Sequence, residues 1–266
     1  MSDTPQIILN KHYDEPTVFT PENLLREARR QKSLPQTQVP RICVLDPDGD
    51  IVRCLIRTEG IAPDPGWACY HTDMYAFRHD GFDLGVIGCA VGAAFAVLIA
   101  EELFACGCEL LISVTSSGQI VPIDNPPYFV LIEKALRDEG TSYHYLAPSD
   151  FSRISPELLA ILSDAFLQTP IKVHNGATWT TDAPFRETET AIAHSRGLGI
   201  LAVEMEAAAL YAFAEARQKA VVCFAHVTNQ MARAEGDFEK GADDGSCDAL
   251  RVIAHAAHAW LNHQTT

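Results

Sequence analysis

Two glutamates lie within the apolar segment LAVEMEAAALYAFA, residues 201–214. If a helix begins near Glu204, a period of 3.6 residues puts Glu206 on one face with three apolar side chains, those of Ala209, Leu210 and Phe213. That face should pack into the core, where a carboxylate without a partner is costly. We therefore expect Glu206 either to pair with an arginine inside the fold or to bind a ligand. Glu204 points about 200° away on an ideal helix, so the two carboxylates need not share a role.

Short polar or small-residue clusters lie at six predicted strand ends. They are DPDGD (46–50), GCAVG (88–92), TSSGQ (115–119), TTDAPF (180–185), EME (204–206) and TNQ (228–230). Proteins of the α/β class bind ligands at the carboxyl ends of their strands, so six clusters in one chain favour a shared site. Each cluster by itself is typical of an ordinary turn.

Strands and helices alternate through most of the chain. The apolar runs that predict strands are 41–46, 82–88, 109–118, 171–181, 200–205 and 220–229, and 128–136 is a further apolar segment. Helical patterns cover 20–31, 93–107, 155–168, 187–197, the segment from 204, and 247–263. This alternation predicts a single-domain α/β protein, a three-layer α/β/α sandwich around a central mixed, largely buried sheet. We expect residues 1–40 to form an N-terminal arm and residues 41–266 to form the domain.

Composition excludes several classes of function. The net charge of −15 opposes binding to nucleic acid or to an anionic membrane surface. No apolar run reaches the roughly 18 residues of a membrane span, and no leader-like segment opens the printed sequence, so we expect a cytoplasmic protein. The eight cysteines form no CxxC pair and are expected to be reduced, buried thiols. His255 and His258 lie on a predicted helix without metal-ligand spacing, and we expect neither a metal nor an organic cofactor.

Several ordered motifs resemble one enzyme family. VEMEAAALYAF (203–213), followed by a strand ending in VTNQ (227–230), is similar to the nucleoside phosphorylase family, which includes uridine phosphorylase, hexameric purine nucleoside phosphorylase and methylthioadenosine nucleosidase. The glycine loop with its helix and strand (86–120), the run 135–151 and TWTTDAPF (178–185) match in the same order. The resemblance extends from about residue 40 to the C-terminus and favours the uridine phosphorylase branch.

The resemblance implies a nucleoside site around Glu206. In the family the second glutamate of this motif accepts hydrogen bonds from the ribose 2′- and 3′-hydroxyls, and the methionine, here Met205, lies against the sugar. A vicinal diol offers two donors and a carboxylate two acceptor oxygens, so the chemistry fits, and such bonds can strengthen in an oxocarbenium-like transition state.

The same resemblance assigns Phe185 to stacking on the base, although an isolated Phe at a strand end is more often a core residue. Asn229 stands where purine enzymes of the family carry an acidic residue. An amide cannot protonate a leaving nitrogen, which disfavours a purine-specific acid mechanism. Arg186 and Gln230 are the nearest candidates for reading a uracil base.

The resemblance also implies a phosphate site. Gly49 and Arg53 correspond to the glycine and arginine of the family's first phosphate loop, and Ser116 and Ser117 keep the hydroxyl positions of the following anion-site strand. Inorganic phosphate would then be the co-substrate.

The chain departs from the family at this site. Ser113 replaces the arginine of the strand, and His71 and Thr72 stand where a neighbouring subunit's arginine is expected. Carboxylates beside the glycine would repel phosphate. Asp48 or Asp50 could instead activate water as the general base, as a glutamate does in the nucleosidase branch, or the aspartates could form a solvated turn.

Three functions remain open at this point: a nucleoside phosphorylase most like uridine phosphorylase, a nucleoside hydrolase on the same scaffold, and a non-catalytic nucleoside-binding protein. The first is the family default. Because family members place parts of one subunit in the neighbour's site, we expect a homodimer or a hexamer built from dimers.

Overall fold

The computed structural model describes residues 4–231 and 235–264, and these contain nine strands and seven α-helices. The strands are β1 Ile42–Asp46, β2 Tyr75–His79, β3 Phe82–Gly88, β4 Leu110–Gln119, β5 Tyr128–Asp138, β6 Phe151–Arg153, β7 Val173–Thr181, β8 Ile200–Glu204 and β9 Ala220–Asn229. The helices are α1 Pro21–Lys32, α2 Asp50–Glu59, α3 Ala93–Ala105, α4 Pro156–Leu162, α5 Glu189–Gly197, α6 Ala207–Arg217 and α7 Ser246–Gln264.

All nine strands belong to one mixed sheet, in the order β2-β3-β1-β4-β8-β7-β5-β6, with β9 between β4 and β5. The strands β3, β1, β4 and β9 run parallel to one another. β9 also pairs antiparallel with β5, and β8 pairs antiparallel with the end of β4. Because β7 pairs with both β5 and β8, the strands β4, β9, β5, β7 and β8 close into a ring. Parallel strands end at one edge, so the loops after β1, β3, β4 and β9 lie close together.

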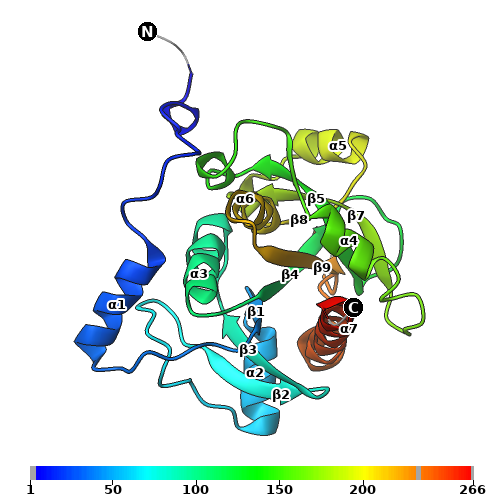
Figure 1. Ribbon diagram of the computed structural model, residues 1–266. Coiled ribbons are helices and arrows are strands. Elements are labelled where there is room, and N and C mark those ends of the chain that lie inside the picture. The colour runs from blue at the N-terminus through cyan, green and yellow to red at the C-terminus, as the bar shows by residue number, and fades with distance from the viewer. Residues whose placement is uncertain (1–3, 232–234, 265–266) are drawn as a thin grey trace.

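Helices cover the sheet in two groups. α3 packs against α1 and α6, while α7 packs against α2 and α4, and in Figure 1 the sheet strand β4 runs between α3 and α7. The apolar strands explain this arrangement because β1 and most of β4, β5 and β9 are buried. The predicted α/β class, the single domain and the central mixed sheet are confirmed.

Two predicted helix bounds were wrong, and one helix was not predicted. No element was predicted between the Asp-rich turn and residue 82, yet α2 begins at this turn, and its buried residues Ile51, Val52, Cys54 and Leu55 share one face. The helix expected over 155–168 ends at Leu162. The helix expected from Glu204 begins at Ala207, because β8 continues through Glu204.

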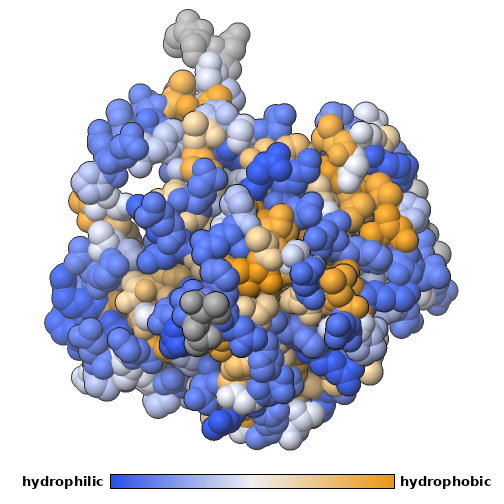
Figure 2. Space-filling view, turned by 45° about the vertical axis from the view of Figure 1, so that its right-hand side comes forward, coloured by the Kyte–Doolittle hydropathy of each residue, from blue (hydrophilic) through white to orange (hydrophobic). Residues whose placement is uncertain are grey.

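The N-terminal segment runs along one side of the molecule and includes α1, which packs against α3 (Figure 1). Thr20 caps α1 by accepting the Asn23 N–H, and Leu25 and Ala28 are buried on the domain. Val18 and Phe19, just before this helix, are 96% and 71% exposed. Figure 2 shows hydrophobic residues exposed between hydrophilic ones over one face of the molecule. Within the described residues, the helices are too short or too polar to cross a bilayer.

Six cysteines are buried thiols, as expected, whereas Cys89 and Cys247 are exposed. None of the eight forms a disulfide. The boundary between the N-terminal arm, residues 1–40, and the domain stays a prediction.

Candidate functional site

Glu206 lies in the bend between β8 and α6, at the N-cap position of the helix. Its side chain is buried, with 1% of the residue exposed. The Gly92 N–H, in the turn between β3 and α3, donates to Glu206 Oε1 over 2.7 Å. Among the described residues Glu206 makes neither a hydrogen bond nor an ion pair with an arginine. The structure therefore gives no support to the arginine-paired alternative.

Glu204 has a different environment although it is also buried. Its Oε2 accepts the N–H groups of Glu206 and Ala207, each over 2.7 Å, and its Oε1 accepts the hydroxyls of Thr178 and Thr180. Four donors satisfy this carboxylate and fix the start of α6. Glu204 is thus a structural residue. Glu206 accepts fewer hydrogen bonds, since its Oε1 lies 2.7 Å from the Gly92 N–H and its Oε2 lies 3.3 Å from the Met205 N–H.

The electrostatics of Glu206 follow from this difference. Burial is the main cause that raises its pKa to about 8, and the charge of Glu204 raises it further. The Gly92 N–H and the Thr115 side chain oppose the shift by hydrogen bonding, and the charge of Asp48 adds to it. Glu206, Thr115 and Asp48 therefore lie close enough to interact, although they come from three different loops or strands.

The loop after β1 brings Asp48 to β4. Asp48 Oδ2 accepts the Ser116 N–H over 2.7 Å. A carboxylate of the protein therefore already binds one backbone donor of the predicted anion-site strand. Gly49 follows with φ of +75°, and a Cβ there would lie 2.7 Å from Cys89 Sγ and 2.8 Å from Arg53 Nη1. The loop therefore requires glycine at this position, both for its backbone conformation and for the close approach of its neighbours.

The cations next to this loop are already paired. Arg53 Nη2 donates to the Asp48 carbonyl over 2.8 Å and forms an ion pair with Asp50. Lys240 forms a second ion pair with Asp50. Asp50 is thus held between two cations, whereas no cationic side chain among the described residues forms an ion pair with the Asp48 carboxylate.

The hydroxyls of β4 have separate environments. Ser117 is buried and its hydroxyl donates to the Thr115 carbonyl. Ser113 is also buried, and its Oγ makes no hydrogen bond to the described part of the chain. Ser116 contributes its N–H to Asp48, as described above. The structure therefore brings Ser116 into the site through its backbone.

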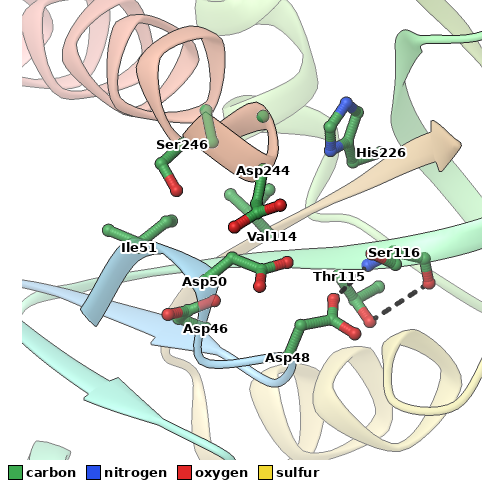
Figure 3. A pocket seen from close by; sticks show the side chains of 12 residues that line it. Asp46, Asp48, Asp50, Ile51, Val114, Thr115, Ser116, His226, Asp244 and Ser246 are labelled. Carbon is green, nitrogen blue, oxygen red and sulfur yellow. Dashed lines mark hydrogen bonds between the residues drawn. The ribbon is translucent and has the colours of Figure 1, made fainter. Parts of the chain in front are cut away.

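A small cavity of about 20 Å³ lies behind the Asp48 loop (Figure 3). Figure 3 shows the side chains of Asp46, Asp48, Asp50 and Asp244 gathered around it, with His226 at one side. Burial is the first cause that lowers the pKa of His226 to about 4, and the charge of Lys240 is the second. The imidazole is therefore neutral near pH 7. The described residues contain no group of three side chains able to hold a metal ion.

The residues predicted to contact the base lie at two strand ends. Phe185, in a short 3-10 helix after β7, is 99% exposed, which excludes the core alternative in the isolated chain. Arg186 follows it and is exposed. Asn229 is buried at the end of β9, where its Oδ1 accepts the Met231 N–H and its Nδ2 donates to Thr228 and Ser117. Gln230 is exposed and donates its N–H to Asp237.

The structure thus links six of the predicted residues into one connected group, whereas the residues predicted to contact the base lie at the ends of β7 and β9. The connected group contains Glu206, Asp48, Ser116, Gly49, Arg53 and Asp50. Gly92, Thr115 and Asp46 lie in three of the clusters at the predicted strand ends, but none of them was assigned a role from the sequence. Their contacts arise only from tertiary structure.

Comparisons with known proteins agree with this architecture. The family model described as "Phosphorylase superfamily" matches residues 49–258. A guanosine phosphorylase of Halorubrum lacusprofundi is 27% identical over 188 residues, which are 68% of this chain and 78% of the relative.

Two solved structures share the fold. The uridine phosphorylase of Vibrio fischeri ES114 has a TM-score of 0.69 at 19% identity, covering 86% of this chain and 96% of that one. The AMP nucleosidase of Bacteroides thetaiotaomicron VPI-5482 has a TM-score of 0.70 at 18% identity, covering 93% and 100%.

Proposed function

The chain belongs to the phosphorylase superfamily, and on this premise we propose that it cleaves the N-glycosidic bond of a ribonucleoside at the Glu206 site. The observation that carries the proposal is a buried carboxylate with few partners at the junction of β8 and α6, beside the Asp48 loop. Such a group is costly in a stable core and is typical of a binding or catalytic site.

The ribose hydroxyls are the proposed partners of Glu206. Two neighbouring hydroxyls donate to the two oxygens of one carboxylate, and these bonds favour its ionised form. Binding of ribose therefore lowers the raised pKa of Glu206 and couples substrate binding to release of a proton. The resulting negative charge stabilises positive charge that develops on the sugar in the transition state. Met205, next to Glu206, is proposed to lie against the same sugar.

Water is the proposed nucleophile, with Asp48 as its general base. The geometry supports water over phosphate because Asp48 already accepts the Ser116 N–H, while Arg53 and Lys240 are both paired with Asp50. An anion carrying nearly two negative charges would meet several carboxylates here. Asp50, held by two cations, is the weaker candidate for the base.

Phosphate remains a second candidate because one observation favours it. Arg53 lies against Gly49, and its side chain is 57% exposed, so it can turn toward an anion bound at the loop. The 27% identical guanosine phosphorylase is consistent with this alternative. In that case Gly49, Arg53, Ser116 and Ser117 would form the phosphate site.

Product analysis distinguishes the two candidates. The protein is incubated with purine and pyrimidine ribonucleosides, with and without phosphate, and free base, ribose and ribose 1-phosphate are measured. Hydrolysis releases ribose at the same rate in both conditions, and Asp48→Asn, which keeps an acceptor for the Ser116 N–H, should lower it at least about a hundredfold. Asp244→Asn, the same chemical change elsewhere on the wall of the cavity, is the matched control and should have little effect. Ribose 1-phosphate formed only with phosphate, together with a raised phosphate KM in Arg53→Ala, would reject water as the nucleophile. No base release from any nucleoside would favour the binding-protein alternative.

The base and assembly assignments are proposals at the same level. Phe185 is proposed to stack on the base, with Arg186, Asn229 and Gln230 near its edge. Phe185, and Val18 and Phe19 of the arm, expose large apolar side chains in the single chain, and their burial against another molecule would be favourable. We propose that a second subunit, in a homodimer or a hexamer of dimers, buries the side chains of the arm. A monomer by light scattering at about micromolar concentration would contradict this.

A further inference from the structure

We propose that Asp46 is the positioning residue of the site: its carbonyl and its ionised carboxylate hold the Asp48 loop, the turn that leads to Gly92 and the start of α2 in one arrangement. The inference rests on the proposed function for its effect on turnover. Its structural part can be tested without any substrate.

The carbonyl of Asp46 joins two loops. Asp46 is the last residue of β1, and its backbone oxygen accepts the Gly49 N–H over 2.9 Å and the Cys89 N–H over 3.0 Å. The first bond closes the turn after β1, and the second holds the turn after β3, whose last residue pairs with Asp46 in the sheet. One carbonyl therefore fixes both turns relative to each other.

The carboxylate of Asp46 adds a third attachment. Its Oδ2 accepts the Val52 N–H over 2.9 Å, in the first turn of α2. Gly49, at the N-cap of this helix, has no side chain to cap it, so Asp46 takes that role from outside the helix. A negative charge is also favoured at the N-terminus of a helix. The position of α2 matters because it carries Arg53 and Asp50.

The two turns lead to the two halves of the site. The turn after β1 presents Asp48, which accepts the Ser116 N–H over 2.7 Å. The turn after β3 leads to Gly92, whose N–H donates to Glu206 over 2.7 Å. Loss of the Asp46 attachment would therefore disturb the proposed general base and the ribose-binding carboxylate together. Asp244 lines the same cavity but holds neither turn among the contacts of the described residues.

The carboxylate is poised to change its protonation state near neutrality. Asp46 is 2% exposed, and burial is the main cause that raises its pKa to about 7. The Val52 N–H and Arg53 lower it, whereas Asp48 and Asp50 raise it. The remaining titratable groups at the cavity are His226 and Asp244, and Lys240 is bound to Asp50.

Protonation weakens this attachment because a neutral carboxyl is a poorer acceptor and loses its attraction to the helix N-terminus. Below about pH 7 the Val52 N–H is then held less firmly, and the loop that carries Asp48 loosens with it. Turnover should therefore decrease further on the acidic side of neutrality, because the loop that carries Asp48 is held less firmly.

The test compares Asp46→Asn with Asp46→Ala and with Asp244→Asn as the matched control. Asparagine keeps an oxygen acceptor for the Val52 N–H but does not titrate, alanine removes the acceptor, and Asp244→Asn makes the same chemical change across the cavity. First, hydrogen exchange of the Val52, Gly49 and Cys89 amides is followed between about pH 6 and pH 8, each variant being compared with the wild type at the same pH.

We expect amide protection in the wild type to decrease, relative to Asp46→Asn, as the pH falls through about 7. Asp46→Ala should lose protection at every pH, by about fivefold or more, and Asp244→Asn should follow the wild type. Equal pH dependence of protection in the wild type and Asp46→Asn would overturn the proposal, whether or not the protein cleaves nucleosides.

The second measurement is kcat/KM for a ribonucleoside over the same pH range. In both proteins kcat/KM should decrease below about pH 8 because Glu206 must lose its proton to bind ribose. Below about pH 7 the wild type should decrease more steeply than Asp46→Asn, because only the wild type also protonates Asp46. An identical acidic limb in both proteins would reject the effect on turnover. If no nucleoside is cleaved but the exchange results are as expected, the proposed function fails and the positioning role of Asp46 stands.

Discussion

Replacing Glu206 by Gln should stabilise the folded protein while removing its proposed function. Glu206 has a pKa of about 8 in the folded chain against a usual value of 4.5, because burial and the charge of Glu204 oppose its ionisation. A raised carboxyl pKa favours the folded state below the usual value, and this advantage is lost as pH rises through the folded pKa. Wild-type stability should therefore decrease from mildly acidic to alkaline pH, and Glu206→Gln should remove much of that decrease.

The size of the effect follows from the shift. Each pKa unit corresponds to about 1.4 kcal/mol, so full ionisation of Glu206 costs up to about 5 kcal/mol. Between about pH 6 and pH 9 the cost increases by about 2–3 kcal/mol. The amide also preserves the acceptor for the Gly92 N–H. The change with pH is the more useful quantity, because any constant cost of the amide cancels from it.

Urea unfolding at both pH values gives this quantity directly from the midpoint and slope. Glu204→Gln is the matched control, since it makes the same chemical change two residues away. The amide can keep its oxygen toward the Glu206 and Ala207 N–H donors only by turning its NH2 group toward Thr178 and Thr180, whose hydroxyls then lose their acceptor, so the variant should be destabilised by about 2 kcal/mol or more. If the stability advantage of Glu206→Gln over the wild type does not grow with pH, the assignment of Glu206 as a strained, few-partner carboxylate is refuted.

Two further predictions concern the scaffold. Gly245→Ala should lower the free energy of unfolding by at least about 2 kcal/mol, because the φ of Gly245 is +78° and a Cβ would lie 2.2 Å from His226 Cε1. Gly197→Ala is the control, since a Cβ there meets open space, and it should change the free energy of unfolding by under about 1 kcal/mol. Arg137→Lys should destabilise by about 2–4 kcal/mol, because the buried guanidinium donates to two serine hydroxyls and two carbonyls of the loop 142–149, and an unchanged thermal midpoint would count against this.

The sequence was sufficient for the elements whose signals are local. Thr20 and Pro21 mark the start of α1, and the apolar runs predict β1, β4 and β9 correctly. It failed where a nearby acidic side chain, and not a usual N-cap residue, marks the start of a helix. Gly49 at the N-cap of α2 has no side chain, and Asp46, six residues before Val52, supplies the acceptor. Glu204 accepts the Glu206 and Ala207 N–H groups at the start of α6, although the helical period of the apolar residues predicts a helix already at Glu204.

The same distinction applies to the site. Glu206 was identifiable because a charge on an apolar helix pattern is a local contradiction. The contact of Asp48 with Ser116 and that of Gly92 with Glu206 join residues 68 and 114 positions apart, and no pattern in the sequence predicts them. Arg137 lies in one of the motifs that resemble the family, and its side chain holds the loop that follows β5 through hydrogen bonds to Ser142 and Ala147.

Cleavage of a ribonucleoside and of its 2′-deoxy analogue by the wild type and by Glu206→Gln tests the central claim most directly. A charge-assisted hydrogen bond contributes roughly 1.5–3 kcal/mol, so Glu206→Gln should lower kcat/KM for the ribonucleoside by at least about tenfold. The 2′-deoxy analogue lacks one of the two donors and should lose distinctly less. An unchanged kcat/KM for the ribonucleoside in a folded variant, or equal losses for both substrates, would contradict the assignment of Glu206 to the ribose hydroxyls.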